Sequence, residues 1–207
     1  MLSNKSQHFI KIFKKAQKKY NGSSKRLTAE GWNQPWQVLI ATIMSAQSRD
    51  ETTIPIAETL FKQYTSLESL NKANYNQVLK IFKSLNYNKT KAKNVIKASQ
   101  YIIQNYNEKI PNTIEQLIQI PGVGRKTANL VLSEIHKQNT ITVDTHVHRL
   151  SNVLQLVKTK TPKQTEQQLE KIAPKQYWSR INRIFVLWGK DIPGRNKEKL
   201  LNSLNQK

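Results

Sequence analysis

The sequence predicts an all-α protein, and three observations favour that class. Apolar residues recur three and four positions apart along nearly the whole chain, strict alternation is scarce, and short connections carry Asn, Pro or Gly. The 207 residues, of which 37% are hydrophobic, suffice for a folded core without a disulfide or a metal ion. Length alone allows one large domain or two small ones.

A basic amphipathic helix is expected first. Its apolar residues share one face and lysines surround that face, so we expect it to dock on a core rather than on a membrane surface. The segment lacks the pattern of a transit peptide and the uninterrupted apolar core of a signal peptide. The residues expected to face the core are Phe9, Ile12, Phe13, Ala16 and Tyr20.

Further helices are expected along the rest of the chain, after a loop that contains Trp32 and Trp36. Apolar stripes at helical spacing predict them over Val38–Ala46, Ile56–Tyr64, Val78–Leu85, Ala92–Ile102, Ile114–Ile118, Ala128–Ile135, Val147–Val157, Leu169–Ile172 and Ile181–Leu187. Beyond Gly194 the tail is rich in Asn and Lys, and its few apolar residues could pack a short terminal helix: Leu200, Leu201 and Leu204.

The charge of the chain favours an acidic partner. Lys and Arg number 34 against 13 Asp and Glu, which gives a net charge of +21. At this size such an excess points to a nucleic acid more than to a small neutral metabolite. A solvated lysine-rich surface, typical of an AT-rich genome, would have the same composition. Charge therefore favours nucleic acid without deciding the partner.

Cysteine and membrane signals are absent from the sequence. The chain has no Cys, which excludes disulfides, thiolate zinc sites and cysteine-ligated iron–sulfur clusters. No apolar run approaches the roughly 20 residues needed to cross a bilayer; the longest is Val38–Met44. We expect a protein of the cytoplasm or nucleoid that does not associate with membranes.

The segment Leu117–Leu130 is the most informative stretch. Pro121 ends one apolar helix, and a second begins directly after Gly124. We expect Gly122 and Gly124 to allow positive φ angles and a close approach of the backbone to a bulky group. Amides of the turn and of the following helix N-terminus would then bind an anion such as a DNA phosphate. A plain Gly-rich turn between two core helices is the alternative.

Four ordered segments together resemble the helix–hairpin–helix DNA glycosylases, and specifically the endonuclease III family. They are Leu117–Leu130, Val143–Arg149, Ser45–Asp50 and Tyr87–Ala92. The resemblance extends over most of the chain, from about Gln37 to Gly189. It implies a two-lobed helical fold with the active site in the cleft between the lobes. The expected lobes are a central domain over 28–138 and a discontinuous domain formed by 1–27 and 139–207.

The resemblance assigns catalysis to Lys126 and Asp144. Lys126 matches the lysine that forms a Schiff base in the bifunctional members of the family, and an accessible amine is a suitable nucleophile. From the residues alone, Lys126 could equally contact phosphate or face solvent. Asp144 matches the family's catalytic Asp, which stabilises positive charge on the sugar, and it could also cap the helix that follows.

This resemblance implies a bifunctional DNA glycosylase and abasic-site lyase of base excision repair, acting as a monomer on double-stranded DNA that carries a damaged base or an abasic site. Oxidised pyrimidines are the expected substrate. Two alternatives stay open: a glycosylase for other bases or mainly a lyase for abasic sites, and a non-catalytic helix–hairpin–helix DNA-binding module. The module would need Gly122 and Gly124 but neither Lys126 nor Asp144.

DNA contacts are expected from three places. By resemblance, Gln47 inserts into the base stack, while Tyr87 stands where the family commonly has Leu as its second wedge; an ordinary exposed loop aromatic is the alternative for Tyr87. Asn86 replaces a frequent family Gly and is expected to tolerate the left-handed conformation. Other expected contact residues are Gly122, Val123, Gly124, Arg125, His146 and Arg149, with Ser45 and Asp50 in support. His146 and Arg149 could instead brace helix ends near Asp144.

The resemblance fails at one place. Many members end with four cysteines that hold a [4Fe–4S] cluster, whereas the corresponding stretch Gly189–Leu204 has none, so no cluster and no cofactor is expected. Basic residues persist in this stretch and would keep its charge: Lys190, Arg195, Lys197 and Lys199. Trp188, where the family often has His, is expected to contribute local packing. His146 and His148 lack converging partners, so we expect no metal site.

Overall fold

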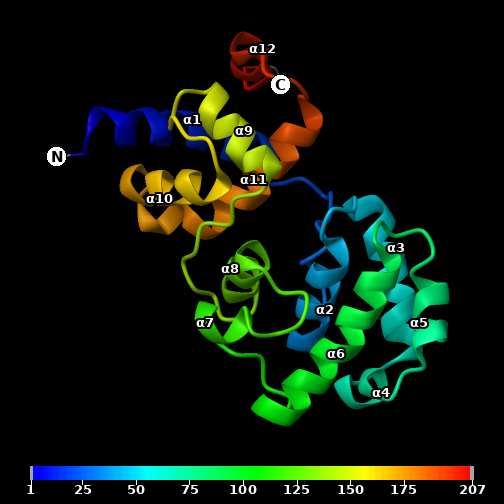
Figure 1. Cartoon of the computed structure of the whole chain (residues 1–207). Helices are drawn as coiled ribbons and strands as arrows, with labels where there is room; N and C mark the ends of the chain where they lie inside the picture. The colour runs from blue at the N-terminus through cyan, green and yellow to red at the C-terminus, as the bar shows by residue number, and fades with distance from the viewer. Residues whose placement is uncertain (1, 206–207) are drawn as a thin grey trace. The chain divides into compact units, whose positions relative to one another are not determined.

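The computed structural model describes residues 2–205, and these residues form helices and no strand, which confirms the predicted class. In chain order the elements are α1 (Asn4–Tyr20), α2 (Pro35–Ser45), α3 (Asp50–Gln63), α4 (Leu67–Asn71), α5 (Tyr75–Ile81), α6 (Asn88–Tyr106), α7 (Ile114–Leu117), α8 (Arg125–Glu134), α9 (Thr145–Val153), α10 (Pro162–Ile172), the 3₁₀ turn η1 (Lys175–Tyr177), α11 (Trp178–Asp191) and α12 (Lys197–Ser203). They are labelled in Figure 1.

The chain divides into two compact units. One unit is continuous, from Arg26 to Lys137, and contains α2 to α8. The other combines residues 1–25 with residues 138–207 and contains α1 and α9 to α12. We expected the division at residues 28 and 138, and the continuous unit found here runs from 26 to 137. Below, the two are called the continuous unit and the discontinuous unit.

Helix α2 forms the centre of the continuous unit. Consecutive residues from Leu39 to Met44 are all buried, so this helix is covered on every side. Pro35 stands in its first turn, where a missing N–H costs no hydrogen bond. α3, α6 and α8 pack against α2, and α6 also packs against α4 and α5 (Figure 1). This packing fixes the C-terminal end of α2, which is followed by Gln47, and the N-terminal end of α6, which is preceded by Tyr87.

Aromatic residues build the core of the discontinuous unit. Phe9 and Phe13 of α1 stack with ring centroids 5.4 Å apart, and Phe13 also lies 5.1 Å from the ring of Tyr177 and 6.2 Å from that of Phe185. Such pairs contribute about 0.5–1.5 kcal/mol beyond the burial of their area. The prediction that the first helix docks on a core is therefore confirmed, since α1 packs on α11 and α10.

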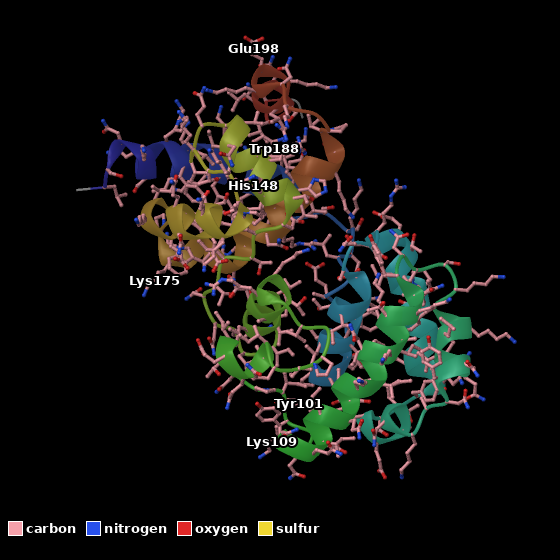
Figure 2. All side chains as sticks on the ribbon, viewed as in Figure 1. Tyr101, Lys109, His148, Lys175, Trp188 and Glu198 are labelled. Atoms are coloured by element: carbon pink, nitrogen blue, oxygen red, sulfur yellow. The ribbon has the colours of Figure 1, made fainter. Side chains whose placement is uncertain are left out.

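The C-terminal segment is held down over α11. Trp188 is fully buried, and its indole Nε1–H donates to Ser203 Oγ of α12 over 3.1 Å (Figure 2). Leu200 of α12 is buried as well, while Lys19 Nζ donates to the carbonyl of Ser203 and Tyr20 Oη to Asp191 Oδ2. The expected short terminal helix and the packing role of Trp188 are confirmed. Among residues 2–205, no helix combines the length and apolarity needed to cross a bilayer.

Candidate active site

The turn between α7 and α8 depends on one glycine for two reasons. Gly122 has a φ angle of 84°, in the left-handed region that side chains rarely adopt. A Cβ at this position would also lie 3.0 Å from Ile43 Cγ2 of α2 and 3.0 Å from Asn94 Cβ of α6. The turn is therefore pressed against two core helices, which fixes where α8 begins.

Gly124 has a different role from the one predicted. Its φ angle is −98°, so the expected positive φ is wrong at this position; only Gly122 of the two adopts it. Gly124 is the N-cap of α8, where it offers no side chain to the first amides of the helix, and a Cβ added to it would meet no atom within 4 Å. The start of α8 is consequently open, as an anion site at a helix N-terminus requires.

Lys126 lies in this open first turn. Arg125 and Lys126 are exposed, whereas Ala128 and Val131 on the opposite side of α8 are completely buried. Val123, also predicted to contact DNA, is buried, and its backbone N–H donates to the carbonyl of Ile120 over 3.0 Å, so neither its side chain nor its amide is available to a ligand at the turn. The buried face of α8 thus fixes the backbone while the amine of Lys126 extends from it and is accessible to a substrate.

Asp144 is the N-cap of α9. Its Oδ1 accepts a hydrogen bond from the backbone N–H of Val147 over 2.8 Å, and the residue is half-buried. The capping interpretation is therefore correct, and it fixes the orientation of the carboxylate. A cap of this kind contributes about 1 kcal/mol to the stability of a helix. Lys126 belongs to the continuous unit and Asp144 to the discontinuous one.

His146 and Arg149 gather around Gly189 within the discontinuous unit. A Cβ at Gly189 would lie 2.5 Å from His146 Nδ1 and 2.9 Å from Arg149 Nη2, so α9 approaches α11 as closely as it does only because Gly189 has no side chain. Burial lowers the pKa of His146, and the positive charges of Arg149 and Lys190 lower it further, although Asp144 opposes them. The neutral imidazole is therefore favoured.

Arg149 braces the backbone that follows α11. Its guanidinium donates to the carbonyl of Gly189 over 2.8 Å and also to those of Ile192 and Gly194. Of the two roles expected for Arg149, phosphate contact and bracing, this arrangement corresponds to bracing. His148, in contrast, is hydrogen bonded through Nδ1 to Thr165 Oγ1 of α10 over 2.7 Å (Figure 2).

The end of α2 carries Ser45 and Gln47. Ser45 Oγ donates to the carbonyl of Thr42 over 2.9 Å, which closes the last turn of the helix. Gln47 follows in the left-handed conformation, with a φ angle of 54°, and its side chain is exposed. Asp50 Oδ1 accepts from both the N–H and the hydroxyl of Thr28, over 3.0 and 2.5 Å. Ser45 and Asp50 thus support the segment around Gln47.

Tyr87 precedes α6 and is 65% exposed, which is unusual for a tyrosine. The left-handed conformation, which Asn86 is expected to tolerate, falls on the next residue, because Tyr87 has a φ angle of 55°. Asn86 Nδ2 instead donates to the carbonyl of Gln47 over 2.7 Å. The structure therefore brings the predicted Gln47 and Tyr87 segments together in the continuous unit. Sequence reasoning missed this bond and the neighbouring buried Lys91.

The stretch Gly189–Leu204, where many members of the family carry their cluster cysteines, does not fit an iron–sulfur cluster. The chain has no cysteine to ligate iron, and Arg149 and Trp188 hold the backbone by hydrogen bonds and packing instead. Across residues 2–205, no group of three or more His, Cys, Asp or Glu side chains could hold a metal ion.

Comparison with known proteins decides the family. Residues 40–175 match the family model of the HhH-GPD superfamily base excision DNA repair proteins. The chain is 39% identical over 158 residues to endonuclease III of Thermotoga maritima, covering 76% of this chain and 74% of that protein. The chain belongs to the endonuclease III family. With endonuclease III of Synechocystis it shares 32% identity over 197 residues, which cover 95% of this chain and 89% of the relative.

Solved structures support the same family membership. A trapped endonuclease III–DNA covalent intermediate matches with a TM-score of 0.83 at 29% identity, covering 92% of this chain and 88% of the other. A thermostable thymine-DNA glycosylase matches with a TM-score of 0.78 at 17% identity, which shows the shared fold alone. The predicted helix–hairpin–helix glycosylase fold is confirmed, and as a member of this family the chain is a DNA glycosylase of base excision repair.

Proposed function

We propose that the chain is a bifunctional DNA glycosylase and abasic-site lyase that removes damaged bases, oxidised pyrimidines in particular, from double-stranded DNA. The observation that carries the proposal is the accessible amine of Lys126 in the first turn of α8, directly after the open Gly124. A trapped covalent intermediate of a similar endonuclease III is consistent with an amine that attacks the substrate. The substrate class rests on the family resemblance.

Binding begins with the sugar–phosphate backbone. The open N-terminus of α8, which begins after Gly124, offers backbone amides to a phosphate, and Arg125 adds a positive charge beside them. The net charge of +21 supplies attraction that does not depend on sequence. Because a damaged base inside a duplex is out of reach, the nucleotide must be extruded, and Gln47 and Tyr87 then fill the gap.

Asp144 and Lys126 have different roles in base release and strand cleavage. The carboxylate of Asp144 stabilises the positive charge that develops on the sugar as the glycosidic bond breaks. The amine of Lys126 attacks C1′, the base departs with a proton, and opening of the sugar ring gives an iminium between Nζ and C1′. Loss of a proton from C2′ then expels the 3′ phosphate by β-elimination, and hydrolysis of the iminium returns the amine.

Borohydride reduction tests this assignment because it converts the iminium into a stable amine that links protein to DNA. We expect Lys126→Ala to abolish trapping on a duplex with thymine glycol. Lys163→Ala is the matched control, since Lys163 is likewise exposed at the second position of a helix, α10. Trapping by Lys126→Ala at the wild-type level would exclude Lys126 as the nucleophile.

A panel of duplexes separates the alternatives. Thymine glycol, an abasic site, 8-oxoguanine and a mismatch are incubated with the protein, with and without hot alkali to reveal abasic products. Nicking of thymine glycol without alkali supports the proposal. Nicking of the abasic duplex alone would identify a lyase for abasic sites, and binding without nicking would identify a non-catalytic module.

A further inference from the structure

The two segments proposed to enter DNA are physically joined. Gln47 follows α2 and Tyr87 precedes α6. Asn86 lies 39 positions after Gln47 in the sequence, and yet its Nδ2 donates to the Gln47 carbonyl over 2.7 Å. A second bond connects the same segments, from Lys91 Nζ in the first turns of α6 to Ser48 Oγ over 2.6 Å. The two bonds therefore come from either side of Tyr87, and both hold the backbone directly after the Gln47 side chain.

We propose that Asn86 and Lys91 are positioning residues that hold Gln47 and Tyr87 as one preformed wedge. The inference rests on the proposed function, in which these two side chains replace the extruded nucleotide and support its partner base. Asn86 stands where the resembling family often has Gly, a residue with no side chain to make this bond, so the connection is a property of this chain.

Backbone conformation supports this role. Gln47 and Tyr87 both have positive φ angles, 54° and 55°, and neither is a glycine. The left-handed region is unfavourable for such residues and persists where the surroundings impose it. The hydrogen bond from the Asn86 side-chain amide to the Gln47 carbonyl is one contact that imposes this conformation, because the bond fixes the peptide that follows Gln47.

Lys91 supplies the rigid part of the connection. It is only 4% exposed, and its neighbours on the buried face of α6, Ala92 and Val95, lie in the core of the continuous unit. Burial lowers the pKa of Lys91 to about 8, because the ammonium is removed from water. The Lys91 ammonium therefore lies in an environment that disfavours its charge, at a position from which it donates a hydrogen bond to Ser48, the residue directly after Gln47.

A preformed wedge changes one step of the reaction. If Gln47 and Tyr87 are already ordered, insertion does not have to restrict them, so the bonds accelerate extrusion from a stacked duplex. They leave the chemistry at C1′ unaffected. Loss of either bond should consequently slow the reaction only where bases must be unstacked.

Single-turnover excision with two substrates tests this split. One substrate carries thymine glycol in a fully paired duplex, and the other carries it in a short unpaired bubble. We expect Asn86→Asp and Asn86→Ala to react about tenfold more slowly than the wild type on the duplex and within about twofold on the bubble. Asn86 is exposed, so these variants keep the fold, which a thermal melt verifies; Lys91→Met should behave alike where it folds.

A double variant provides the internal control. In the Gln47→Ala background the Asn86 substitution should slow the duplex reaction by a clearly smaller factor than in the wild type, since only Tyr87 is left for Asn86 to position. Wild-type rates on the duplex, or equal slowing on duplex and bubble, would overturn the wedge. If wild-type protein releases thymine glycol from neither substrate, the proposed function fails and the inference with it.

Discussion

Replacing Gly189 by alanine tests how tightly α9 packs against α11. An added Cβ would lie 2.5 Å from His146 Nδ1, 2.9 Å from Arg149 Nη2 and 3.0 Å from His146 Cβ. Distances this short require a shift of α9 itself, because the nearest atoms include the Cβ of His146. Overpacking of a filled interior costs about 1–3 kcal/mol.

Two further contributions enter the magnitude. Alanine is favoured over glycine inside a helix by about 1 kcal/mol, which opposes the clash. Displacement of Arg149 weakens its hydrogen bonds to the carbonyls of Gly189 and Ile192, each worth about 1 kcal/mol or more because the donor is charged. We expect a net loss of about 1–3 kcal/mol, and for a chain of this length a fall in Tm of roughly 3–10 °C.

Thermal unfolding followed by circular dichroism measures the effect, with Gly22→Ala as the matched control. Gly22 is exposed, has no left-handed φ angle, and its added Cβ would meet nothing within 4 Å, so this variant should melt within about 2 °C of the wild type. Equal melting of the two variants would refute the tight packing. Adding His146→Ala to Gly189→Ala should restore part of the loss, since it removes the nearest atom.

Three other changes have defined outcomes. Asp144→Asn retains an N-cap and should melt near the wild type while base release falls at least a hundredfold, whereas Asp144→Ala should also lose about 1 kcal/mol in urea unfolding. Because folding lowers the pKa of His146 from 6.5, the unfolded state binds more protons than the folded state below about pH 6.5, and the free energy of unfolding should fall on acidification. Urea titrations of His146→Gln should show a weaker dependence of that free energy on pH. Trp188→Leu removes buried volume and the bond to Ser203, and we expect about 2–4 kcal/mol lower stability by the same measurement.

Local sequence patterns correctly predicted the features that depend only on neighbouring residues: helix faces, the turn before α8 and the cap of α9. Apolar spacing placed α1 and its buried face, and the string around Gly122 placed the turn that presents Lys126. Asp144 was predicted as a cap because it directly precedes an apolar-periodic helix, and it accepts the expected backbone hydrogen bond. These predictions needed only neighbouring residues.

Contacts between distant segments account for the failures. Both glycines of the turn permit a positive φ, but only Gly122 adopts one, and it is also Gly122 that packs closely against Ile43 and Asn94 of other helices. The residue type of Asn86 indicated only that it tolerates a left-handed conformation, whereas in the structure Tyr87 adopts that conformation and the Asn86 side chain donates to the Gln47 carbonyl. No spacing in one sequence shows that these residues meet.

The discontinuous unit imposes an order on folding. Helix α1 is synthesised before the continuous unit, whereas Tyr177 and Phe185, against which Phe13 packs, are synthesised after it. During translation the continuous unit can complete its core while the aromatic face of α1 still has no partner. Closing so long a chain segment is slow, and an exposed aromatic face favours aggregation in the meantime. The lysines that surround that face carry like charges, which oppose the association of one such helix with another before α11 is synthesised.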